Sequence, residues 1–167
     1  MKAIKLAIIS FVILFLLVTV ISLFIPSNVR ISRALQINAS KEKVLEQVGN
    51  AANWKIWFPG MDTAQLFYVA GKVEGMVLNE KSKRFLAISE RNDSAVTAEY
   101  KSIKQKKVMM GWNILPDRDS TVTVQWYMDF TLRWYPWEKF SSILFEKQYG
   151  PQMEQGLARM KNLLENN

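Results

Sequence analysis

Large aromatic and methionine side chains are the residues of this chain whose types and spacing could form a binding site. Nine of them are candidates to line a pocket: Trp54, Trp57, Phe58, Tyr100, Met110, Trp112, Trp126, Met128 and Met153. Methionine adapts its shape and aromatic rings offer flat contact area, which suits an apolar ligand. The alternative is that these residues fill a solid core. A core position is most expected for Trp126 and for Phe130, a further aromatic residue of the same predicted strand. Trp54 and Trp57 could form a lid over a ligand, a plug of the core or an edge that touches a membrane.

Side chains able to act as a general acid or base are few. The chain has no His and no Cys, which excludes an imidazole base, a thiol nucleophile, a disulfide and metal sites built from these ligands. The remaining candidates are Glu74, Glu90, Glu99, Tyr100, Asp129 and Glu154. The carboxylates among them form no evident inward-facing pair, and the sequence contains no calcium-loop, phosphate-loop or nucleophile-elbow pattern. We therefore predict no catalytic residue, no metal ion and no cofactor.

Basic residues gather at the ends of expected strands. They are Lys81, Lys83, Arg84, Lys101, Lys104, Lys106 and Lys107. They form either ordinary solvated turns or a patch that touches acidic lipid headgroups. The whole chain has a formal net charge of +7, and the part after the first 27 residues has 20 Lys and Arg against 15 Asp and Glu. This scattered charge is too weak to indicate nucleic acid as a partner, and it suits a domain close to an anionic bilayer.

One segment near the N-terminus has the composition of a membrane anchor. Leu6 to Ile25 are 20 consecutive residues without charge, and 16 of them are Leu, Ile, Val or Phe. A helix of this length, at about 1.5 Å per residue, crosses the roughly 30 Å hydrocarbon core of a bilayer. A secretory signal peptide is the alternative, but its apolar region usually has only about 7–15 residues. We expect residues 1–27 to be an uncleaved single-pass anchor and residues 28–167 to be one domain.

Charges beside this segment favour one orientation. Lys2 and Lys5 precede it, and a short basic N-terminus usually stays in the cytoplasm while a long following domain is translocated. Arg30 and Arg33 on the other side weaken the asymmetry. The expectation is a cell-membrane protein that contacts the bilayer through Leu6–Ile25 and holds its domain outside the cytoplasm.

Alternating apolar residues and turn signals predict a series of strands. The expected strands are residues 30–37, 66–70, 72–79, 84–90, 96–103, 107–115 and 121–133. The last is the clearest, because apolar side chains occupy every second position from Val122 to Leu132. Turns are expected over residues 91–94 and at Pro116, Asp117, Arg118 and Asp119.

Helical patterns stand on both sides of these strands. Ser40 is expected to cap a short helix, and residues 53–58 are expected to form another. Near the C-terminus an apolar stripe recurs every three or four residues, at Tyr149, Met153, Leu157, Met160 and Leu164. Pro151 either begins this helix or kinks a longer one that starts near Trp137. Gly156 lies beside the stripe, where a missing side chain would let the helix approach a sheet.

These elements define an architecture. An antiparallel sheet with one apolar face must bury that face, and the last helix is the element long and apolar enough to cover it. We expect an α+β fold in which a curved antiparallel sheet of six or seven strands wraps around a long C-terminal helix, with a transmembrane helix in front. The short helices would close one end and leave a pocket between sheet and helix.

Four stretches of the chain carry a family resemblance. They are Ile37-Asn38-Ala39-Ser40 with Lys43-Val44, Asn53-Trp54 and Trp57-Phe58-Pro59; Gly71 with Gly75; Thr121 to Trp126; and Tyr149-Gly150-Pro151 with Glu154, Gly156-Leu157 and Lys161. In order and spacing, residues 30–165 resemble the helix-grip superfamily, also called SRPBCC. This superfamily includes START lipid-transfer domains, Bet v 1-like plant proteins and polyketide cyclase/dehydrase proteins. The nearest resemblance is to membrane-anchored bacterial members of the polyketide cyclase/dehydrase and lipid-transport family.

The resemblance implies a ligand class, whereas periodicity alone implies only the sheet and the helix. We expect a membrane-anchored protein that binds a hydrophobic small molecule or lipid and performs no chemistry. One alternative is an enzyme of the cyclase or dehydratase type that acts on an apolar substrate. Another is a structural or interaction domain with a solid core.

Overall fold

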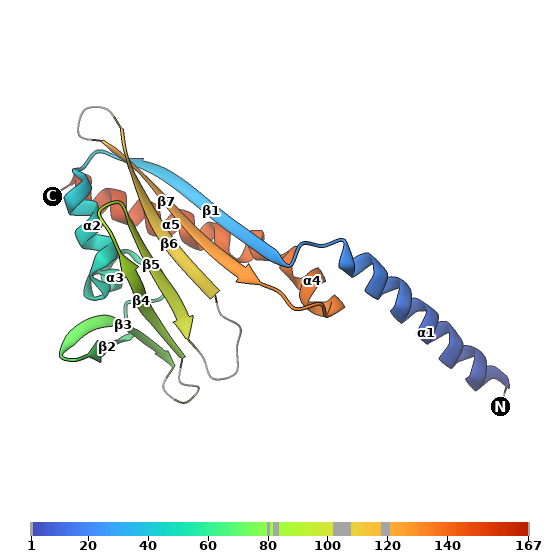
Figure 1. Ribbon diagram of the computed structural model, residues 1–167. Coiled ribbons are helices and arrows are strands. Elements are labelled where there is room, and N and C mark those ends of the chain that lie inside the picture. Colours follow the sequence, from blue (N-terminus) through green and yellow to red (C-terminus); the bar gives the residue numbers. More distant parts are fainter. Residues whose placement is uncertain (1, 80, 82–83, 102–107, 118–120, 167) are drawn as a thin grey trace.

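A single antiparallel sheet forms the body of the domain (Figure 1). The computed structural model describes residues 2–79, 81, 84–101, 108–117 and 121–166. Within these ranges the sheet has seven strands in the order β1-β7-β6-β5-β4-β3-β2. The strands are β1 (Asn28–Ile37), β2 (Gln65–Val69), β3 (Lys72–Asn79), β4 (Arg84–Arg91), β5 (Ala95–Lys101), β6 (Val108–Pro116) and β7 (Val122–Thr131). The first strand therefore pairs with the last, and the others follow in chain order.

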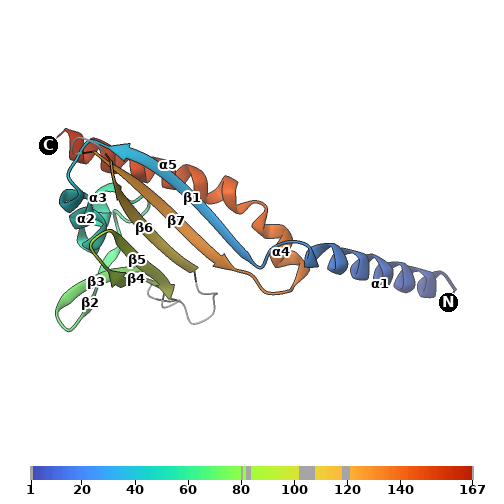
Figure 2. The same cartoon turned by 45° about the horizontal axis from the view of Figure 1, so that its top comes forward.

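Five α-helices and one 3₁₀ turn accompany the sheet in the described residues. They are α1 (Lys2–Leu23), α2 (Lys41–Gly49), the 3₁₀ turn η1 (Ala51–Asn53), α3 (Trp54–Trp57), α4 (Pro136–Ser142) and α5 (Phe145–Glu165). Figures 1 and 2 show α5 running along the sheet beside β1, with α2 and α3 at one end. Helix α1 leaves from the opposite end, next to α4. This arrangement confirms the expected helix-grip fold.

Strand β7 shows why the sheet has one apolar face. Val122, Val124 and Trp126 are buried, while Thr123 and Gln125 between them are only partly covered. Successive side chains of a strand point to opposite faces, so this alternation places one set against α5 and the other set outside. The strand expected over residues 121–133 is thus confirmed, although β7 spans the shorter range Val122–Thr131.

The apolar stripe of the last helix is confirmed, but the position of Pro151 differs from both expectations. Met153, Leu157 and Met160 are fully buried under the sheet. Helix α5 starts at Phe145, so Pro151 lies inside it, and the separate helix α4 precedes it. The residues from Pro136 onward do not continue into α5, because α4 ends at Ser142.

Local hydrogen bonds explain where two elements begin and end. The Ser40 side chain accepts a hydrogen bond from the Lys43 backbone N–H at 3.5 Å, which caps α2 as expected. In the turn between β4 and β5, Asn92 Oδ1 accepts hydrogen bonds from the N–H groups of Ser94 and Ala95. Such an Asn turn is a common way to reverse the chain between strands.

Some expected features lie outside the described residues. These are Ile103 in the strand expected over 96–103, Arg118 and Asp119 in the expected turn, and Lys83, Lys104, Lys106 and Lys107 in the basic clusters. By length and composition, helix α1 could cross a membrane. A signal sequence would satisfy the same criteria.

Candidate functional site

A cavity of about 350 Å³ lies between the sheet and α5. Strands β3 to β7, helix α5 and the segment after α3 all contribute to its wall. The lining residues are Phe58, Pro59, Met61, Leu78, Arg84, Leu86, Tyr100, Val108, Met110, Trp126, Met128, Phe130, Tyr149, Gln152 and Met153. The volume is within the range of about 300–1,000 Å³ that is usual for small-molecule sites.

Strand register explains why these residues meet. On β7, Trp126, Met128 and Phe130 are two residues apart and therefore share one face. The neighbouring strand β6 places Met110 opposite Met128 and Val108 opposite Phe130. In the same way, β4 places Leu86 opposite Tyr100 of β5. Each strand thus adds a short row of apolar side chains to the same wall.

Six of the nine pocket candidates from the sequence lie on this wall: Phe58, Tyr100, Met110, Trp126, Met128 and Met153. The structure places the other three, Trp54, Trp57 and Trp112, in the core behind the wall, where each has no exposed surface. The Trp112 ring lies 5.5 Å from that of Trp54 and 5.7 Å from that of Trp126. These tryptophans pack the closed end of the fold, and any role in ligand binding stays a prediction.

Four polar side chains also reach the cavity wall: Arg84, Tyr100, Tyr149 and Gln152. Two donor atoms of lining residues, Arg84 Nε and Trp126 Nε1, are buried and have no hydrogen-bond partner among the described residues. A buried donor without a partner costs about 1–3 kcal/mol, and neither of these two atoms has exposed surface toward the cavity. Burial, and secondarily the charge of Tyr100, raises the pKa of Tyr149 above its ordinary value.

The candidate acid and base carboxylates lie away from this wall. Asp129 accepts hydrogen bonds from Arg30 at 2.6 Å on the outer face of the sheet. Glu154 of α5 is paired with Arg33 of β1 at 2.5 Å. Glu74 lies 3.6 Å from Arg91. Glu90 is exposed, and neither it nor Glu99 is among the described residues that line the cavity. Among the candidates for proton transfer, Tyr100 does line the cavity.

No group of three or more His, Cys, Asp or Glu side chains gathers closely enough to hold a metal ion in the described part of the chain. The described residues that line the cavity include no carboxylate, the charged oxygen ligand of hard cations.

Sequence reasoning missed several lining residues, including Leu78, Arg84, Tyr149 and Gln152. The sequence placed Arg84 among basic residues expected to form either solvated turns or a patch that touches acidic headgroups. A usable signal was present, because Arg84 and Leu86 are two residues apart on one strand and must share a face. Tyr149 and Gln152 stand on the same side of α5 as Met153, at helical spacing.

The sheet, the helix beneath it and the cavity between them define the class of helix-grip proteins. Solved structures agree with this fold. A START superfamily protein from Mycobacterium smegmatis has 14% identity and a TM-score of 0.62, covering 82% of this chain and 97% of that chain. The protein XoxI from Bacillus cereus has 15% identity and a TM-score of 0.59, with coverage of 81% and 94%.

A truncated norcoclaurine synthase from Thalictrum flavum also has this fold, at 13% identity and a TM-score of 0.59, with 81% of this chain and 92% of that chain covered. A search of curated proteins found no match. The model of the family described as polyketide cyclase / dehydrase and lipid transport matches residues 28–165, from the start of β1 to the end of α5. The chain belongs to this family.

Proposed function

We propose that this protein is a membrane-anchored binding protein for a hydrophobic small molecule or lipid, which it holds without chemical change. The observation that carries the proposal is the cavity of about 350 Å³ between the sheet and α5, lined mostly by apolar, aromatic and methionine side chains. A solid-cored interaction domain would not need this space, because protein interiors are otherwise closely packed. Membership of a family described by lipid transport supports the same class of ligand.

The polar groups of the wall favour an amphiphilic ligand with an acidic end. Arg84 is the charged side chain among the described residues that line the cavity, and it is only partly buried. A carboxylate can accept hydrogen bonds from a guanidinium group, and hydrogen bonds between charged groups are the stronger kind. The remaining wall would contact the apolar body of the ligand.

An enzymatic role is the second candidate function, and two tyrosines support it. Tyr100 and Tyr149 line the cavity, and one structural neighbour is a synthase. The Tyr149 phenol is protonated at neutral pH, as in an ordinary tyrosine, and burial raises its pKa further, so it can donate a hydrogen bond but cannot act as a general base. Binding without chemistry accounts for the wall more simply, because the described lining residues include no carboxylate.

The anchoring part of the proposal relies on α1 and on the residues just after it. Lys139 of α4 donates hydrogen bonds to the Ile25 carbonyl oxygen at 2.7 Å and to Ser27 Oγ at 2.8 Å. The fold thus uses the residues that would be lost or freed by cleavage near Ile25, which favours an uncleaved anchor over a signal peptide. Protease accessibility in spheroplasts would show whether residues 28–167 lie outside the cytoplasm.

The ligand is tested with the full chain purified in detergent. Mass spectrometry of the extracted lipids should detect a co-purified amphiphile, and a fluorescent fatty acid should bind. Arg84→Gln should weaken binding of the fatty acid about 10- to 100-fold, as expected for loss of a hydrogen bond to a charged group. Arg91→Gln is the matched control, because Arg91 is on the same strand and pairs with Glu74 away from the cavity.

The outcomes separate the parts of the proposal. Absence of both a co-purified ligand and fatty-acid binding would refute the binding function. Equal binding of a fatty acid and its methyl ester, unaffected by Arg84→Gln, would refute the acidic headgroup and leave hydrophobic binding in place. Chemical conversion of the bound molecule, lost in Tyr149→Phe, would instead establish the enzymatic alternative.

A further inference from the structure

A patch of large apolar side chains is exposed on and beside α4. It consists of Trp134, Trp137, Phe140, Ile143 and Leu144, which we call the α4 patch, and each is 37–64% exposed. Single exposed apolar residues are normal on protein surfaces, but a contiguous group marks an interaction site. Five such residues within eleven positions of the chain form a group of this kind.

Helix α4 is amphipathic in the reverse sense from a helix in water. Pro136, Lys139 and Ser142 recur every third residue and face the protein, where each is buried. The opposite face carries Trp137 and Phe140, followed by Ile143 just after the helix. A helix that packs its lysine inward and turns its aromatic rings outward is suited to an apolar environment rather than to water.

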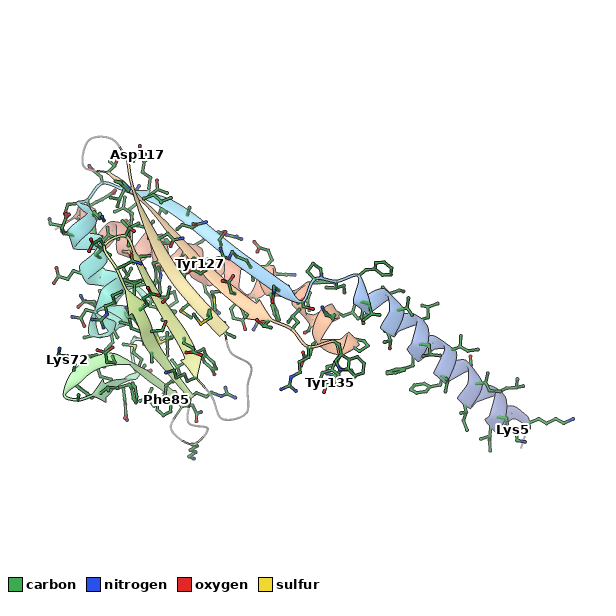
Figure 3. The ribbon with its side chains drawn as sticks, in the orientation of Figure 1. Lys5, Lys72, Phe85, Asp117, Tyr127 and Tyr135 are labelled. Carbon is green, nitrogen blue, oxygen red and sulfur yellow. The ribbon has the colours of Figure 1, made fainter. Side chains whose placement is uncertain are left out.

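The position of α4 indicates which apolar environment this is. Lys139 Nζ is bonded to the Ile25 carbonyl and to Ser27 Oγ, so α4 is held directly at the end of α1. Phe24, the first residue after α1, is 86% exposed. In Figure 3, Tyr135 stands at the end of the domain from which α1 leaves. If α1 spans a bilayer, the α4 patch lies at the depth where the span emerges.

Aromatic side chains at this depth have a known preference. Tyr135 and Trp137 are stacked, with ring centroids 4.9 Å apart, and Trp134 packs on Tyr135 at the same distance. The Arg133 guanidinium lies 6.0 Å from the Tyr135 ring centroid. Trp and Tyr concentrate at membrane interfaces, where the ring contacts acyl chains and the polar edge contacts water and headgroups. An arginine beside them can reach the phosphates.

We propose that the α4 patch inserts into the interfacial region of the bilayer that α1 spans and holds the domain against the bilayer surface. This inference rests on the proposed anchoring by α1. A small hollow beneath α4 shares Val108 and Phe130 with the ligand cavity. Insertion of the patch therefore brings the α4 end of the cavity close to the lipid.

The chain contains no cysteine, so a single introduced cysteine can carry a nitroxide without background. Full-length Ile143→Cys, Phe140→Cys, Val12→Cys and Ile56→Cys variants are labelled and reconstituted in nanodiscs of phosphatidylcholine with some phosphatidylglycerol. Electron paramagnetic resonance then compares collisions with oxygen, which partitions into lipid, and with a water-soluble nickel chelate. Ile56 of α3 is the matched control, because it is 59% exposed against 64% for Ile143 and lies at the far end of the domain.

The expected result is that labels at positions 12, 140 and 143 are shielded from the nickel chelate and accessible to oxygen. The chelate collision rate at position 143 should be several-fold lower than at position 56. Shielding at position 12 with full chelate access at 140 and 143 would overturn the inference and leave the anchor in place. Chelate access at position 12 as well would refute the membrane anchoring by α1 and, with it, the insertion of the α4 patch.

Discussion

Gly156 of α5 lies directly against the indole ring of Trp126 on β7. A Cβ atom at position 156 would be 2.7 Å from Trp126 Cζ3 and 3.0 Å from Pro59 Cδ. The indole is itself held by Phe58, whose ring centroid is 4.8 Å away. The missing side chain therefore sets how closely the helix approaches the sheet, and with it one dimension of the cavity.

The Gly156→Ala variant should be less stable than the wild type. Alanine is better than glycine in a helix by about 1 kcal/mol, but overpacking against a ring that cannot move costs about 1–3 kcal/mol. We expect a net loss of roughly 1 kcal/mol in the free energy of unfolding, measured by urea denaturation. Gln155→Ala, at an exposed position of the same helix, is the control and should change stability little. A Gly156→Ala protein as stable as this control would contradict the packing described.

The turn between β2 and β3 should be open to stabilisation. Ala70 and Gly71 form a two-residue turn with φ values of 48° and 79°, a geometry that favours Asn-Gly. Ala70→Asn should raise the free energy of unfolding by about 0.5–1 kcal/mol, because asparagine tolerates the left-handed region better than alanine.

The reverse effect is expected at the next residue of that turn. Gly71 has no neighbouring atom within 4 Å of a Cβ, so Gly71→Ala changes only the backbone preference. It should cost about 1–2 kcal/mol. Thermal unfolding measures the stability change of Ala70→Asn and of Gly71→Ala. A change of the same sign in both variants would refute the turn geometry.

Two buried tryptophans should respond differently to replacement by phenylalanine. Trp54 Nε1 donates a hydrogen bond to the Val48 carbonyl oxygen at 2.9 Å, near the end of α2, whereas Trp112 Nε1 has no partner in the described part of the chain. Both side chains are fully buried in the same cluster. Trp54→Phe should therefore cost about 1–3 kcal/mol more than Trp112→Phe, because it leaves a buried carbonyl without its donor. Equal losses in urea denaturation would contradict this difference.

Tyr149 predicts a loss of stability at high pH. Its pKa in the folded protein is raised above the ordinary value of about 10 by burial and then by Tyr100. The folded state therefore keeps the proton more tightly than the unfolded state, and this contribution is fully present below pH 10. It is lost as the pH rises through the folded pKa.

Urea denaturation between pH 8 and 11 measures this effect. Tyr149→Phe should make stability fall less steeply above pH 10, and absorbance at 295 nm should show the loss of one late-titrating tyrosine. Tyr68→Phe is the control, since Tyr68 is 58% exposed. The same slope in Tyr149→Phe and the wild type would show that another group dominates alkaline unfolding.

Local patterns allowed much of the fold to be predicted. Alternation identified β7, helical spacing identified the buried stripe of α5, and the cap at Ser40 located α2. Gly156 was expected where a helix meets a sheet, and it lies there. These features depend on residues a few positions apart, whose relative directions are fixed by the backbone period.

The wall of the cavity and the environment of α4 could not be predicted in the same way. Alternation shows that Trp112 and Trp126 point inward, but whether an inward ring fills space or borders it depends on what the opposite element leaves empty. Lys139 is an ordinary charged residue by sequence, and only the fold brings it to Ile25 across the whole domain.

The sequence by itself therefore determined the apolar N-terminal helix, the order of strands and helices, and which face of each is apolar. Three features were decided by the tertiary structure alone: the volume of the cavity, the presence of Arg84 on its wall and the exposure of the α4 patch beside the end of α1. The physical reason is range: side-chain direction follows from neighbouring backbone bonds, whereas empty space and exposure follow from the distance between elements far apart in the chain.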